Sequence, residues 1–194
     1  MPAPVSTPVP GPPAAPAPTF EAVYASHAGF VLRNLRRLGV NDAALDDAAQ
    51  DVFVVVHRRL PEFEGRSAIS TWLFAIVVGV ARNQRRTRRR RAPESGGNEA
   101  ETDILAAAPA ERPDRRAEQS QSIRVLMSLL DELDEDKREA FVLSQLEQMT
   151  APEMAEALHL NVNTVYARIR ASIQAFEQAV ARHRARETST GRPQ

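Results

Sequence analysis

Residues 150–170 read TAPEMAEALHLNVNTVYARIR, and this stretch predicts two short helices joined by a tight turn. Thr150 followed by Glu153 is the pattern of a capping box, which starts a helix by pairing two side chains with the exposed backbone N–H groups. Asn161 is a suitable N-cap for the second helix. Ala155 supplies the small side chain that is needed where the two helices cross. The stretch therefore predicts a helix-turn-helix.

The second helix of this pair presents a polar face near its N-terminal end, which is the end that enters the major groove in such motifs. Amide and guanidinium groups can pair with base edges or phosphates, and a tyrosine can contact a phosphate or a thymine methyl group. The outward positions are Val162, Asn163, Tyr166, Ala167 and Arg170. A helical hairpin with a solvated polar face gives the same pattern, so spacing alone leaves both interpretations open.

Further upstream, apolar residues recur at steps of three and four from Phe20 to about Arg91, which predicts three helices. Gly39 is expected to stop the first helix and Pro61 the second. A polar loop then leads to the third helix, from Thr71 to about residue 90. We expect an all-α protein of two small helical domains: a three-helix N-terminal bundle and a C-terminal helix-turn-helix.

Charge is segregated along the chain, although the formal net charge is zero. Residues 19–92 contain 13 arginines against 7 acidic residues, a net charge of +6, while residues 93–118 and 119–186 carry −4 and −2. A basic helix of this density normally faces a polyanion. Its arginines are Arg82, Arg85, Arg86, Arg88, Arg89, Arg90 and Arg91.

Trp72, the only tryptophan, precedes this basic run at the start of the third helix. An aromatic side chain beside a basic surface suits stacking on unpaired bases, but a lone tryptophan in a small helical domain is more often part of the core. Phe63 and Phe74 carry the same two interpretations.

The second predicted helix carries an acidic stripe opposite its apolar face, formed by Asp46, Asp47, Gln50 and Asp51. The stripe is either a solvated surface or a docking face for a basic partner. The apolar face of the same helix is expected to be buried and to consist of Leu45, Ala48, Ala49, Val52, Phe53 and Val56.

The remaining sequence indicates the domain boundaries and gives no sign of a metal site, a cofactor site or a membrane-spanning segment. We expect a Pro/Ala-rich disordered tail over residues 1–18, a domain over 19–91, a flexible linker over 92–118, a second domain over 119–186 and a tail over 187–194. The chain has no cysteine, and its histidines lack metal-ligand spacing, so we expect no metal and no cofactor. With neither a signal sequence nor a long apolar segment, a cytoplasmic protein without membrane insertion is expected.

Two stretches, DDAAQDVFVVVHRRLPEFEGRSAISTWLFAIVVGVARNQRRTRRR (46–90) and LLDELDEDKREAFVLSQLEQMTAPEMAEALHLNVNTVYARIRAS (129–172), resemble the extracytoplasmic-function (ECF) sigma factors of the sigma-70 family of bacterial RNA polymerase. The first resembles the core of their polymerase-docking and minus-ten-binding domain. The second resembles their minus-thirty-five-reading helix-turn-helix. The resemblance covers about residues 19–91 and 122–180.

The resemblance implies a transcription initiation factor that is not an enzyme, with core RNA polymerase (largest-subunit clamp and flap) and promoter DNA as partners, and in many relatives an anti-sigma factor. The polymerase-binding residues it implies are Asp47, Gln50, Asp51 and Phe53. Those implied for minus-ten DNA are Glu64, Gly65, Arg66, Ser67, Ser70, Thr71, Trp72, Arg82, Arg85 and Arg86. Those implied for minus-thirty-five DNA are Val162, Asn163, Thr164, Tyr166, Arg168 and Arg170.

The chain departs from the family pattern at several of these surfaces. Gly79 and Ala75 stand where many relatives have Asn and Arg, and both lie on the helix implied to face DNA. Elsewhere His57 and Tyr166 stand where Trp and Lys are frequent, and Gln148 and His159 replace the usual glycines.

Two other classes of protein fit the sequence less well. A helix-turn-helix regulator that binds duplex DNA as a dimer without polymerase leaves the acidic stripe, the Trp72 loop and the linker unexplained. An enzyme would need a catalytic constellation or a phosphate-binding glycine loop, and the sequence shows neither.

Overall fold

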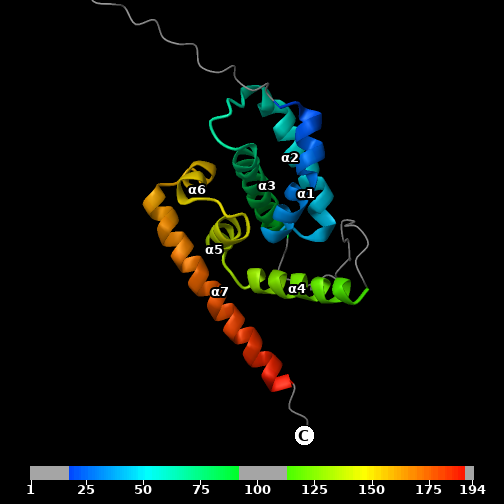
Figure 1. Cartoon of the computed structure of the whole chain (residues 1–194), viewed down its shortest axis with the longest axis vertical. Helices are drawn as coiled ribbons and strands as arrows, with labels where there is room; N and C mark the ends of the chain where they lie inside the picture. Colours follow the sequence, from blue (N-terminus) through cyan, green and yellow to red (C-terminus); the bar gives the residue numbers. More distant parts are fainter. Residues whose placement is uncertain (1–17, 92–112, 191–194) are drawn as a thin grey trace, which may run out of the picture.

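The computed structural model describes residues 18–91 and 113–190, and every regular element in those two ranges is helical (Figure 1). The expected all-α class is therefore confirmed. The first range folds into three main helices and two short 3₁₀ turns. They are α1 Phe20–Arg37, η1 Asp42–Ala44, α2 Leu45–Arg59, η2 Leu60–Glu62 and α3 Ile69–Arg91.

The three N-terminal helices pack on one another around a common apolar core. Val31, Val52 and Val56 have no exposed surface, and Phe74 lies beside them with its ring edge-on to Phe30 at a centroid distance of 6.1 Å. In the predicted stripe of α2 every member is buried except Ala49, which is half-buried. Phe74 is therefore a core residue and is not available for stacking on a base.

Gly39 turns the chain sharply after α1. Its φ of +88° lies in the left-handed region, where glycine has no side-chain penalty. The N–H groups of residues 38, 39 and 40 donate to the carbonyls of Asn34, Arg36 and Leu35, which closes the last turn of the helix. The predicted stop at this glycine is confirmed.

The second range forms a second group of helices, whose buried apolar residues belong to the same core cluster as those of the first group. Its elements are α4 Pro113–Asp131, α5 Glu135–Phe141, a π-helical turn η3 Val142–Leu146, α6 Ala151–Leu158 and α7 Val162–Thr190. Phe141 of α5 stacks on Phe176 of α7 with centroids 4.1 Å apart and planes 20° apart. Leu143, Met154 and Val165 are fully buried nearby.

Two helix ends differ from expectation. α4 begins at Pro113, inside the segment 92–118 that was predicted as linker, and α7 continues to Thr190, past the predicted end near residue 186. Both extensions lack the apolar periodicity on which the prediction depended. Residues 113–118 (PDRRAE) contain Arg, Ala and Glu, which favour helix, and Pro113 suits the first helical position, whereas residues 187–190 (ETST) continue α7 by one further turn. Residues 1–17 and 92–112, on which the tail and most of the linker fall, lie outside the described residues.

The helix-turn-helix is formed as predicted by α6 and the start of α7. The capping box is present: the Glu153 carboxylate accepts from the backbone N–H of Thr150 at 2.8 Å, and the Glu153 N–H donates to the Thr150 hydroxyl at 3.5 Å. The Asn161 side chain accepts from the N–H of Asn163 at 2.8 Å, so it caps α7. His159 forms the turn with a φ of +54°.

Loss of the capping box should weaken the C-terminal domain in a pH-dependent way. The hydrogen bonds from the Thr150 hydroxyl and backbone lower the pKa of Glu153. Its stabilising effect is therefore present above the ordinary glutamate pKa and is lost as the pH falls through the lowered pKa. We expect Thr150→Ala to reduce the free energy of unfolding by about 1 kcal/mol at pH 7.

Urea denaturation of the Thr150→Ala variant from pH 7 to pH 3 checks this expectation. The difference from the natural protein should shrink as Glu153 becomes protonated. Ser128→Ala is a matched control, because Ser128 also bonds within a helix but caps no helix start. An equal difference at both ends of the pH range would contradict the assignment to Glu153.

Candidate polymerase and nucleic-acid interfaces

The acidic stripe lies on the outer face of α2. Asp47, Gln50 and Asp51 are exposed, whereas Phe53 is only 8% exposed and packs against the rings of Phe20 and Tyr24 on α1. Asp51 accepts a hydrogen bond of 3.2 Å from the side-chain amide of Gln84 on α3. Three of the four implied polymerase-binding side chains are thus available to a partner, and Phe53 is almost fully covered within the protein.

A shallow groove of about 270 Å³ runs beside this stripe. The Phe20 ring meets His57 at a centroid distance of 5.1 Å, and the Tyr24 ring meets Phe53 at 4.7 Å. Tyr24 and Val54 are also unusually exposed for apolar side chains, at 50% and 42%. The groove is lined by Phe20, Gln50, Phe53, Val54, His57 and Arg58.

Sequence reasoning did not assign this groove. Phe20 and Tyr24 shared the three- and four-residue spacing of the first helix, and that spacing does not distinguish a ring at the edge of the core from one inside it. Val54 could have been noticed, because it follows the buried pair Val52 and Phe53 on a helix and so must point elsewhere.

The loop before α3 is exposed and partly self-paired. The carboxylate of Glu64 forms an ion pair with Arg66, and Gly65 between them has a φ of +69°. Ser67 and Trp72 are half-buried, and Thr71 is buried. The Trp72 ring contacts Phe63 with centroids 5.4 Å apart, so part of the indole face is already used inside the protein.

The arginines of α3 divide into two groups. Arg86, Arg88, Arg89 and Arg90 are exposed. The side chain of Arg85 is only 13% exposed, and Arg82 is also partly covered, because both meet residues of the C-terminal domain. The hydrogen bonds from Arg82 to Glu139 raise the pKa of its guanidinium above the ordinary value.

The N-terminal part of α7 presents most of the residues implied to read the minus-thirty-five element. Asn163, Thr164 and Arg170 are exposed, and Tyr166 is 50% exposed. Val162 is half-buried. Arg168 forms an ion pair of 2.8 Å with Asp136 of α5, so its guanidinium is engaged within the protein.

These surfaces do not converge on one site. The structure places the acidic stripe on α2, the loop and arginines on α3, and the reading residues on α7. In the described part of the chain, no group of three metal-ligating side chains is gathered. Likewise, none of the described helices combines the length and apolarity required to cross a bilayer.

Comparison with known families and proteins agrees with this division. Residues 23–91 match the family described as Sigma-70 region 2, and residues 123–175 match Sigma-70, region 4. The RNA polymerase sigma-H factor of Pseudomonas aeruginosa is 30% identical over 146 residues, which is 73% of this chain and 76% of that protein. The ferric citrate uptake sigma factor FecI of Escherichia coli is 33% identical over 153 residues, covering 76% and 82%.

Among solved structures, CnrH in complex with the cytosolic domain of CnrY is similar, with a TM-score of 0.59 and 25% identity over 84% of this chain and 87% of that one. The two family matches occur in the same order as the two groups of helices. The chain belongs to the sigma-70 family of RNA polymerase sigma factors, in its extracytoplasmic-function group.

Proposed function

We propose that this chain binds core RNA polymerase, brings it to promoters and helps to open the DNA there, without catalysing a reaction itself. The observation that carries the proposal is the presence, in one chain, of a region 2 match with an exposed acidic face and a region 4 match with an exposed reading helix. Since the largest subunit's clamp and the flap are the surfaces that such regions meet in the family, they are the proposed contacts.

Within this proposal the roles divide by element. Asp47, Gln50 and Asp51 on α2 would meet the clamp, and the adjacent groove would accept an apolar side chain from it. The loop 64–70 would receive an unstacked base of the minus-ten element, whose unstacking costs about a few kcal/mol. The exposed residues of α7, with Asn163 and Arg170 foremost, would read the minus-thirty-five element.

Thr71 and Trp72 have a more limited part in this proposal than the resemblance implies. Thr71 is buried and therefore supports the start of α3 rather than touching DNA. Trp72 is half-buried against Phe63, so a base can stack only on the remaining face of its ring.

The experiment is reconstitution with purified bacterial core RNA polymerase. The protein should co-elute with the core enzyme, and the reconstituted enzyme should start transcripts at specific sites on genomic DNA of the source organism. Neither core enzyme alone nor the protein alone should show this specificity.

The second candidate is a dimeric helix-turn-helix regulator, and the same experiment separates the two. Sequence-specific binding of promoter DNA by the isolated protein as a dimer, without co-elution, would contradict the sigma-factor proposal. Because CnrH is bound to the cytosolic domain of CnrY, we also propose that an anti-sigma factor holds this chain, over the α2 face and the helix-turn-helix. The proposed location is cytoplasmic.

A further inference from the structure

Gln84 links α3 to the acidic stripe on α2. Its side-chain amide Nε2 donates to Oδ2 of Asp51 at 3.2 Å, and Gln84 is half-buried where the two helices meet. In the part of the chain that the structure describes, Asp46, Asp47 and Gln50 form no side-chain hydrogen bond or ion pair. Asp51 is therefore the carboxylate of the stripe whose orientation is set by a second helix.

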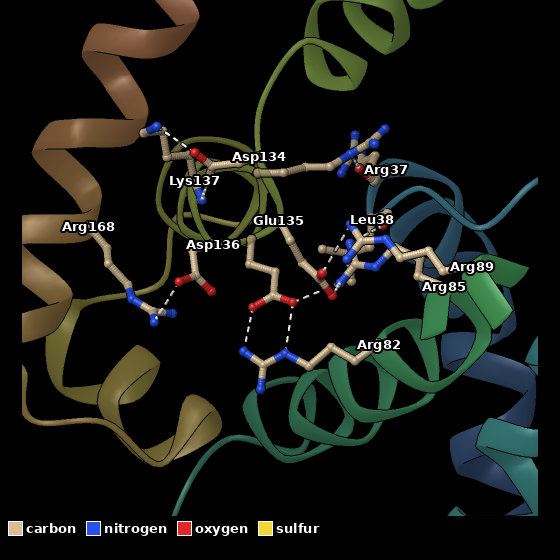
Figure 2. Close-up of polar contacts among 12 residues, drawn as sticks. Arg37, Leu38, Arg82, Arg85, Arg89, Asp134, Glu135, Asp136, Lys137 and Arg168 are labelled. Carbon is tan, nitrogen blue, oxygen red and sulfur yellow. Dashed lines mark hydrogen bonds and ion pairs between the residues drawn. The ribbon is translucent and has the colours of Figure 1, made fainter. Parts of the chain in front are cut away.

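The arginines beside Gln84 on α3 point to another part of the molecule. Arg82 Nε and Arg85 Nη2 each donate to the Glu139 carboxylate of α5 at 2.9 Å, at the joint between the two domains. Figure 2 shows the guanidinium groups of Arg82 and Arg85 pointing away from α3 and toward α5. Although this part of α3 is rich in arginine, the side chain that reaches Asp51 is a neutral amide.

A neutral donor leaves the negative charge of Asp51 in place. An arginine at position 84 would form an ion pair with the carboxylate, whereas the amide of Gln84 orients the carboxylate without neutralising it. A carboxylate has about four acceptor sites, and Gln84 fills one of them on Oδ2. Among the described residues no donor reaches Oδ1, so Asp51 keeps most of its acceptor capacity for a basic partner.

The hydrogen bond is not needed to hold α2 and α3 together. The two helices already share the apolar core, in which Val52, Val56 and Phe74 have no exposed surface. A side-chain hydrogen bond at the surface replaces bonds to water and adds little to stability. It does restrict the Asp51 side chain, and a side chain that is fixed before its partner arrives loses less entropy on binding.

We propose that Gln84 is a positioning residue for polymerase docking, which holds the Asp51 carboxylate in place for a basic side chain of the partner and leaves its charge available. The inference rests on the proposed function, because that function assigns α2 to the clamp. It adds a residue of α3 that acts on docking through Asp51.

The test measures the affinity of the labelled full chain for core RNA polymerase. Gln84→Ala removes the donor and should weaken binding about fivefold, the size expected for one net hydrogen bond. Asn83→Ala is the matched control, because Asn83 is an exposed amide next to Gln84 that accepts from Arg86 of α3 instead. This control should leave the affinity nearly unchanged. Equal affinities of Gln84→Ala and Asn83→Ala would overturn the proposal.

A double-mutant cycle shows whether Gln84 acts through Asp51. In an Asp51→Ala background, Gln84→Ala should cause no further loss of affinity, because the carboxylate that it orients is absent. The same loss in both backgrounds would mean that Gln84 acts independently of Asp51, and would overturn the positioning role.

Gln84→Arg separates positioning from simple bracing of the two helices. The arginine keeps a donor to Asp51 but pairs with its charge, so core polymerase should bind more weakly than with Gln84→Ala. Asn83→Arg adds the same charge one position away and should bind more tightly than Gln84→Arg. If Gln84→Arg binds as well as the natural protein, the hydrogen bond only braces α3 against α2. If it binds as well as Asn83→Arg, the added charge alone explains the loss. Either result contradicts the proposal.

Failure of the proposed function gives a different pattern. If the natural protein does not co-elute with core polymerase, or if Asp51→Ala binds as tightly as the natural protein, the assignment of α2 to the clamp is wrong and the inference fails with it. If Asp51→Ala is weakened while Gln84→Ala equals its control, docking through α2 stands and only the role of Gln84 is overturned. Urea denaturation should give all variants midpoints close to that of the natural protein, because the changes lie at the surface.

Discussion

Replacing Asp51 with arginine should reduce binding to core RNA polymerase by about 100-fold or more. Asp51 lies exposed at the C-terminal end of the acidic stripe on α2, and the proposed partner surface is basic. Placing like charges against each other across such an interface costs several kcal/mol, about the free energy that a 100-fold weaker affinity represents. Within the protein, the substitution removes the 3.2 Å hydrogen bond that Gln84 donates at the surface.

Titration of labelled protein with core polymerase measures the change in affinity directly. The melting temperature should change little, because surface substitutions usually alter stability by about 0.5 kcal/mol or less. Glu62→Arg is the matched control: it makes the same change of charge at an exposed position of η2, outside the stripe. An Asp51→Arg protein that assembles as well as this control would refute the assignment of α2 to the clamp.

Replacing Phe74 with alanine should destabilise the N-terminal domain by about 3–5 kcal/mol. The ring has no exposed surface, and it packs edge-on against Phe30 in the centre of the three helices. Truncating the side chain removes its buried apolar area and leaves a cavity that rigid helices cannot fully close. Such a change is a large fraction of the stability of a small domain, which is typically about 5–15 kcal/mol.

Trp72 makes this measurement selective, since it is the only tryptophan and lies in α3. Urea denaturation followed by its fluorescence therefore reports on the N-terminal domain. The midpoint should fall without a matching change in slope. Tyr24→Ala, which truncates an aromatic side chain that is 50% exposed, should cost far less. Equal destabilisation by the two substitutions would show that Phe74 is not a central core residue.

The parts of the fold that follow local rules could be predicted from sequence. The capping box at Thr150, the cap at Asn161 and the stop at Gly39 each depend on a few neighbouring residues, and all three are confirmed. The structure also explains why relatives usually have glycine at the positions of Gln148 and His159. Their φ values are +53° and +54°, in the region where glycine is unstrained, so the usual glycines of relatives suit these turns better.

The joint between the domains could not be predicted in this way. Glu139 lies 57 positions from Arg82 in the chain, and nothing local distinguishes it from a solvated glutamate. The net charge of each segment indicated only that acidic and basic parts exist. Which carboxylate meets which arginine depends on how α5 is placed against α3, and that depends on packing across the whole molecule.

The length of α7 has a mechanical consequence. Its 29 residues span about 43 Å at about 1.5 Å per residue, with the proposed reading residues at one end. Near the other end, Arg182 and Arg186 hold Glu132, which directly follows α4. A helix without a kink bends little over this length, so a movement at one end of α7 is transmitted to the other end. A rotation of a few degrees at the contact with α4 would therefore displace the N-terminal end of α7, which is proposed to enter the groove, by about several ångströms.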